Sequence, residues 1–170
     1  MLKVVDTAFT FKTSPQEIKK QVHYCVNDIC RSNSVIGGRK MNFGIIGYGN
    51  IARKFVKSIT YTSGGRVHAI ASHSLDENDS YLQNHPLVKL YRDYEELLKD
   101  EDIEAVYIAV PHYEHKKWII EAIKHHKAVL CEKPLVLKSE DIDEINQYVK
   151  EYQGYCLEAF KTKFNMVLII

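Results

Sequence analysis

The sequence predicts an α/β fold in which helices cover both faces of a doubly wound parallel sheet. Three observations lead to this prediction. The chain has 170 residues, which is enough for one such domain with a proper core plus an appendage. From residue 41 onward, short apolar runs typical of buried parallel strands alternate with helix-forming segments. A glycine-rich turn joins the first of these runs to the first helix.

The elements follow one another regularly along the chain. The first strand ends at Ile46, and the first helix runs from about Ile51 to Ile59. Because strands and helices alternate, the crossovers should be right-handed and the strand order 3-2-1-4-5-6, as in a Rossmann-type sheet. Further strands are expected at residues 66–72, 87–91, 104–110, 128–131 and 155–160, with helices within 75–85, from 93, through Trp118, and at 139–152 with a cap at Ser139.

Residues 1–40 form an N-terminal extension that the sequence predicts to be helical. Ser14, Pro15 and Glu17 make a favourable helix start, and an apolar stripe continues to Cys30. The stripe covers either the core of the domain or a partner. Residues 37–40 can be encoded by purine-rich codons, and a bacterial ribosome-binding site is a purine-rich stretch directly before a start codon. We therefore hypothesise that Met41 is the natural start and that the extension is mis-assigned.

Composition excludes several classes of partner. The formal net charge is +1 with scattered basic residues, which gives no reason to expect nucleic acid or an anionic membrane. No apolar run is long enough to span a bilayer, and the N-terminus lacks a signal-type apolar core. The four cysteines lack metal-site spacing, so reduced, mostly buried thiols in a cytoplasmic protein and no metal site are expected. They are Cys25, Cys30, Cys131 and Cys156.

The turn after the first strand carries a dinucleotide fingerprint, Gly-x-Gly-x-x-Ala. Gly47 permits the tight turn, Gly49 lets a pyrophosphate approach the backbone, and Ala52 lets the helix pack closely on the strand. The amides at Asn50 and Ile51 begin a helix whose amino terminus favours phosphate. The sequence therefore predicts binding of NAD or NADP.

The end of the second strand bears on the choice of cofactor. A carboxylate at this place would bind the ribose 2′-hydroxyl and favour NAD, but the sequence has Ser72, His73 and Ser74, with Asp76 the first acid. A carboxylate would also repel the 2′-phosphate of NADP. Because none stands at this place, NADP is tolerated and can be preferred. The alternative for His73 is an ordinary surface histidine.

Three motifs together resemble the N-terminal domain of the Gfo/Idh/MocA oxidoreductases. They are the glycine turn, the stretch from Pro111 to His115, and the stretch from Cys131 to Pro134, in that order. The resemblance covers Met41 to about residue 165. Residues 157–164 look like the linker of the branch that includes dihydrodiol and xylose dehydrogenases, except that Lys163 replaces a usual arginine.

The resemblance implies roles for the later motifs. Lys133 would lie beside the nicotinamide and the substrate hydroxyl and assist hydride transfer, and Glu132 would bind the ribose or hold Lys133. The alternative for Lys133 is a packed stem with its ammonium in water. Other implied cofactor contacts are Val110, Pro111 and His112, with His115 bracing the site.

The implied function is hydride transfer between a nicotinamide cofactor and a sugar-like or cyclic diol substrate. The domains expected are the extension 1–40, the NAD(P)-binding domain 41–165 and a truncated tail 166–170, because family members continue into a second, substrate-binding domain. Alternatives are a catalytically incompetent dinucleotide-binding fragment and a nucleotide-sensing interaction protein.

Overall fold

The computed structural model describes residues 3–5, 26, 29, 39–76 and 78–159. Their strands and helices alternate as the sequence predicts. The strands are β1 (Lys3–Val5), β2 (Met41–Ile46), β3 (Gly65–Ala71), β4 (Lys89–Tyr91), β5 (Ala105–Ile108), β6 (Ala128–Glu132) and β7 (Cys156–Ala159). The helices are α2 (Asn50–Ile59), α3 (Ser80–Asn84), α4 (Tyr94–Lys99), α5 (His115–Lys124) and α6 (Glu140–Glu151), with a 3₁₀ turn at His112–Glu114.

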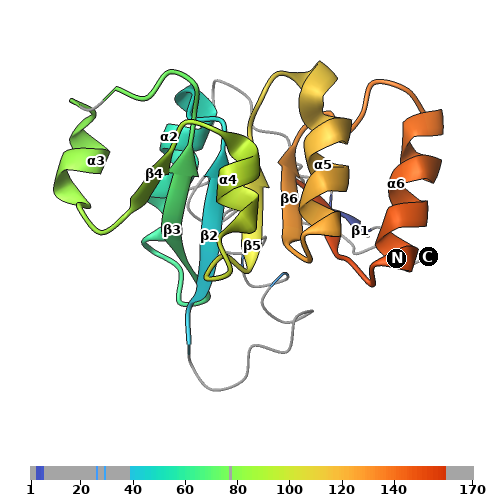
Figure 1. Ribbon diagram of the computed structural model, residues 1–170, viewed down its shortest axis with the longest axis horizontal. Helices are drawn as coiled ribbons and strands as arrows, with labels where there is room; N and C mark the ends of the chain where they lie inside the picture. The colour runs from blue at the N-terminus through green and yellow to red at the C-terminus, as the bar shows by residue number, and fades with distance from the viewer. Residues whose placement is uncertain (1–2, 6–25, 27–28, 30–38, 77, 160–170) are drawn as a thin grey trace.

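The described strands form one parallel sheet in the order β1-β7-β6-β5-β2-β3-β4 (Figure 1). The predicted order 3-2-1-4-5-6 is confirmed for the six strands from β2 onward. The seventh strand, β1, was not predicted. It pairs with β7 so that Lys3 lies opposite Leu157. The extension is therefore not purely helical.

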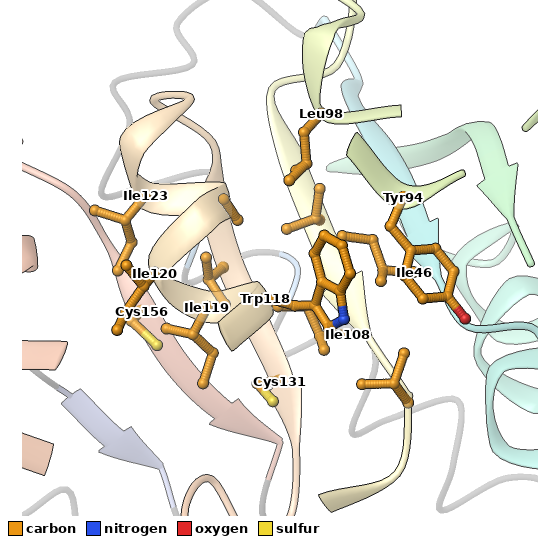
Figure 2. Close-up of a cluster of buried hydrophobic side chains, with 14 of the residues drawn as sticks. Ile46, Tyr94, Leu98, Ile108, Trp118, Ile119, Ile120, Ile123, Cys131 and Cys156 are labelled. Carbon is orange, nitrogen blue, oxygen red and sulfur yellow. The ribbon is translucent and has the colours of Figure 1, made fainter. Parts of the chain in front are cut away.

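Two apolar layers hold the sheet between its helices. On one face α2 packs over the sheet, and the rings of Phe55 and Tyr107 stack with their centroids 3.8 Å apart. On the other face α4, α5 and α6 pack over the sheet. Figure 2 shows Trp118 of α5 beside Tyr94 of α4 and Ile46 of β2. Cys131 and Cys156 are free and buried in this second layer, as expected, and burial raises the pKa of the Cys156 thiol to about 12.

The extension contributes to the first layer. Val26 and Ile29 are helical and fully buried in it. Val26 Cγ1 lies 2.8 Å from the position that a Cβ at Gly65 would take. At these two positions the predicted stripe covers the core of the domain. The rest of the predicted helix lies outside the described residues, and the hypothesis about Met41 stays a prediction.

The start of α6 differs from the prediction in how it is capped. Ser139 is the N-cap residue of α6, as predicted, but its hydroxyl makes no capping hydrogen bond, so the prediction is wrong in that part. Three acidic side chains in the first turn favour this helix start through the helix dipole instead. None of the helices in the described part of the chain combines the length and apolar character that a bilayer crossing requires.

Candidate functional site

The predicted site residues meet at one edge of the sheet, where the parallel strands end. They follow or end four strands that are neighbours in the sheet, β3, β2, β5 and β6. In open α/β sheets this carboxyl edge is where ligands bind. The residues are Gly47, Gly49, Asn50, Ile51 and Ala52 after β2, Ser72 and His73 after β3, Val110, Pro111, His112 and His115 after β5, and Glu132 and Lys133 at the end of β6.

Gly47 makes the turn that the fingerprint requires. Its φ is +86°, and a Cβ there would lie 2.7 Å from the carbonyl oxygen of Ala109. Its amide donates to the carbonyl oxygen of Ala71 at 3.0 Å. Glycine is needed at this position because the turn is left-handed and because it is wedged against the backbone that follows β5.

Gly49 plays a different part. It is exposed, its φ is −82°, and a Cβ there would meet no atom of the described part of the chain within 4 Å. The fold itself therefore tolerates a side chain at Gly49. A glycine here keeps open the space directly in front of α2, which is the space that a pyrophosphate would occupy.

The amino terminus of α2 is left without a side-chain cap. Gly49 is its N-cap residue, and among the described residues no side chain hydrogen-bonds the first-turn amides of Asn50, Ile51 and Ala52. Two other helices of the described chain begin differently, because Asp79 caps α3 and Asp93 caps α4. Uncapped first-turn amides and the helix dipole together make an anion-binding end.

At the end of β3, Ser72 and His73 are held in different ways. Ser72 is buried, and its hydroxyl accepts the amide of Ser74 at 3.3 Å. His73 is exposed, and its Nδ1 lies 2.9 Å from the carbonyl oxygen of Arg92. The ring of His73 also lies 4.5 Å, centroid to centroid, from the ring of Tyr94. His73 is thus the more accessible of the two predicted residues.

After β5, the predicted residues separate into an exposed and a buried group. Pro111 and His112 are exposed, whereas Val110 is buried. His115 is fully buried, with Nδ1 2.8 Å from the carbonyl oxygen of Pro134 and Nε2 3.0 Å from that of Val110. Burial lowers the pKa of His115, against the opposing effect of these carbonyl oxygens. His115 therefore lies between the two loops with each ring nitrogen facing a backbone carbonyl oxygen, and the neutral ring donates a hydrogen bond to one of the two.

Glu132 and Lys133 occupy the end of β6. The carboxylate of Glu132 accepts the hydroxyl of Tyr107 and, at 3.3 Å, the backbone amide of Lys133. Burial raises the pKa of Glu132 to about 6. Lys133 is half-buried, and the peptide bond between Lys133 and Pro134 is cis. Glu132 thus hydrogen-bonds a tyrosine and the backbone, and its expected roles, binding the ribose or holding Lys133, stay predictions.

A network that sequence reasoning missed fixes the glycine turn. The hydroxyl of Tyr48 donates to Asp79 at 3.1 Å, and Arg53 forms an ion pair with the same carboxylate. The guanidinium of Arg53 also lies over the ring of Tyr48, 4.6 Å from its centroid. These contacts join the turn and α2 to the start of α3. Tyr107 was missed too, although a hydroxyl within the apolar run of β5 was a usable signal.

Two other features lie apart from the predicted residues. A cavity of about 570 Å³ lies at the opposite edge of the sheet, lined by Met41, Glu104, Lys127 and Tyr155 among others. In the described part of the chain, one group of metal-ligand type was found, formed by His68, Asp100 and Asp102. The ammonium of Lys89 lies 2.9 and 3.1 Å from these two carboxylates, which compensates their charge.

The arrangement fits a dinucleotide laid across the carboxyl edge. The uncapped start of α2 and the open space before Gly49 suit a pyrophosphate. The end of β3 then suits the adenosine ribose, and the loops after β5 and β6 suit the nicotinamide end.

Comparison with known proteins agrees with this geometry. Residues 41–160 match the family model described as "Oxidoreductase family, NAD-binding Rossmann fold" for the Gfo/Idh/MocA proteins. The chain is 32% identical over 124 residues to trans-1,2-dihydrobenzene-1,2-diol dehydrogenase of Xenopus tropicalis. That match covers 72% of this chain and 38% of the relative, so the chain spans well under half of the relative's length.

Two solved structures are similar as well. An NAD-binding protein from Listeria innocua has a TM-score of 0.63 and 31% identity, over 71% of this chain and 35% of that one. The 3-ketoreductase KijD10 from Actinomadura kijaniata, in complex with TDP-benzene and NADP, has a TM-score of 0.64 and 27% identity. That match covers 71% of this chain and 38% of KijD10.

Proposed function

The chain belongs to the Gfo/Idh/MocA oxidoreductase family with its NAD-binding Rossmann fold, and from this premise we propose that it binds NAD or NADP for hydride transfer. The observation that carries the proposal is the uncapped amino terminus of α2 behind Gly49, where the fold leaves open space. The amides of Asn50, Ile51 and Ala52 would hold the pyrophosphate there. When bound, the nicotinamide supplies the hydride chemistry.

The remaining residues would position the two ends of the cofactor. Ser72 and His73 would face the adenosine ribose, since they follow β3 beside the glycine turn. Val110, Pro111 and His112 would border the nicotinamide ribose. His115 would act indirectly, by fixing the loop after β5 to the turn at Pro134.

Lys133 is the proposed catalytic residue. It is half-buried at the carboxyl end of β6, in a turn held by Glu132 and the cis Pro134. From this place its ammonium would polarise a substrate hydroxyl or carbonyl and hold or release its proton. The substrate would be a sugar-like molecule or a cyclic diol, because the similar proteins include a dihydrodiol dehydrogenase and a 3-ketoreductase.

Calorimetric titration of the 170-residue chain with NADH and with NADPH tests the proposal. Saturable binding of at least one of them, lost in Gly49→Ala, is the expected result. Absence of binding by both at millimolar concentration would refute it. For Lys133, oxidation of cyclic diols with NADP⁺ is the assay, and a variant Lys133→Ala that retained full turnover would remove it from the reacting centre.

A further inference from the structure

In the imidazole ring of His73, one nitrogen is always protonated, and the protonation of the other can change. Its Nδ1 lies 2.9 Å from the carbonyl oxygen of Arg92, and a carbonyl oxygen can only accept a hydrogen bond. Nδ1 therefore carries a proton whether the imidazole is neutral or charged. Nε2 alone changes: it is an acceptor in the neutral ring and a donor in the protonated ring.

Packing against a second aromatic ring holds the orientation of the His73 ring. The ring of Tyr94 lies 4.5 Å from that of His73. Tyr94 is itself buried and meets the ring of Trp118 edge-on, with centroids 4.9 Å apart and an interplanar angle of 90°. Because the hydrogen bond and the packing act together, the imidazole keeps Nδ1 toward Arg92 and Nε2 away from it.

His73 also stands where the two cofactors differ. It is the second residue after β3, and the last residue of that strand, Ala71, accepts the amide of Gly47 at 3.0 Å. The end of β3 beside the glycine turn is the place of the adenosine ribose in this class of fold. NAD has a 2′-hydroxyl there, which can donate a hydrogen bond, whereas the 2′-phosphate of NADP is an anion that favours donors.

We propose that His73 makes the choice between NAD and NADP depend on pH, an inference that rests on the proposed function. The neutral ring offers the Nε2 lone pair, which accepts from a 2′-hydroxyl and opposes a phosphate. The protonated ring offers an N–H and a positive charge, which bind the phosphate. The ratio of NADPH affinity to NADH affinity is therefore higher for the protonated ring than for the neutral ring.

The other ionisable groups near His73 do not produce this effect. They are Arg92 and Asp93 after β4, Tyr94 at the start of α4, and Asp76 on the loop that follows β3. Histidine is the side-chain type whose charge ordinarily changes between about pH 5 and pH 8, and arginine, tyrosine and aspartate are types that ordinarily change theirs outside that range. The 2′-phosphate itself can titrate near about pH 6, as phosphate monoesters do, so the experiment must separate its effect from that of His73.

The experiment is a fluorescence titration of the full chain with NADH and NADPH between about pH 5.5 and pH 8, the range over which histidine titrates. In the wild-type chain the affinity ratio should rise by about tenfold or more at low pH, as expected for a gained charge-assisted hydrogen bond. His73→Gln should lose this rise. His73→Arg should prefer NADPH throughout, and any remaining pH dependence in it measures the phosphate alone.

A matched control is His85→Gln. His85 has the same arrangement, with Nδ1 2.8 Å from the carbonyl oxygen of Tyr81, but it lies at the far end of α3. This variant should keep the wild-type pH dependence. If His73→Gln also keeps it, or if the wild-type ratio changes no more than that of His73→Arg, the inference is wrong while the proposed function stands. If neither cofactor binds the wild-type chain at any pH, the proposed function fails and this inference with it.

Discussion

Gly47 and Gly49 should respond to alanine in opposite ways, although they are two residues apart in one turn. At Gly47 the φ of +86° is left-handed, which costs a non-glycine residue about 1–2 kcal/mol. The new Cβ would also lie 2.7 Å from the backbone oxygen of Ala109, and overpacking of this kind costs about 1–3 kcal/mol. Gly47→Ala should therefore lose about 2–5 kcal/mol of unfolding free energy.

Gly49→Ala should leave the fold nearly unchanged, within about 0.5 kcal/mol, because the φ of −82° is ordinary and nothing lies within 4 Å of the new methyl group. The methyl group would instead enter the space that a pyrophosphate needs, so NADH affinity should fall at least about tenfold. Urea unfolding and calorimetric titration on both variants measure the two effects. A destabilised Gly49→Ala, or one that binds NADH like the wild type, would refute the reasoning.

Three further predictions concern the rest of the site. Burial raises the pKa of Glu132 from its ordinary 4.5 to about 6, so the wild type should lose about 2 kcal/mol of stability relative to Glu132→Gln as the pH rises through this interval. Urea unfolding of both proteins below and above this pH interval checks the prediction. A difference in unfolding free energy between the two proteins that does not change with pH would contradict it. Asp79→Ala removes the cap of α3 and the partner of Arg53 and should cost about 1–3 kcal/mol, whereas Asp76→Ala, which loses one exposed hydrogen bond from the amide of Asn78, should cost less than about 1 kcal/mol. Lys133→Ala should leave NADH affinity within about twofold while removing turnover, since its proposed role is at the reacting end; calorimetry showing lost binding would argue against that placement.

The sheet from β2 onward could be predicted because most of its strands are buried apolar runs bounded by turn residues, and parallel pairing leaves few orders open. The first strand could not, since Lys3–Val5 pairs with β7, which lies at the other end of the described chain. Ser139 shows a different limit. A serine before acidic residues is typical of a capped helix start, but whether its hydroxyl reaches an amide depends on a rotamer that sequence does not determine.

The edge that carries the candidate site could also be predicted, because the motifs end strands that lie side by side. The contacts that orient the side chains could not. Tyr107 and Glu132 are 25 residues apart, and the partner of His73 is a backbone oxygen, which has no residue-type signal. Even so, the predicted difference between the two glycines follows from their backbone angles and surroundings alone.

The position of the bound cofactor tests the account most directly. In an amide NMR titration of the full chain with NADH, the largest shifts should fall on Gly49, Asn50 and Ile51, with smaller ones at His73 and Lys133. The cavity at the opposite edge, around Glu104 and Lys127, should be unaffected. Shifts concentrated at that opposite cavity, or an unchanged spectrum at saturating NADH and NADPH, would contradict the claim that α2 holds the pyrophosphate.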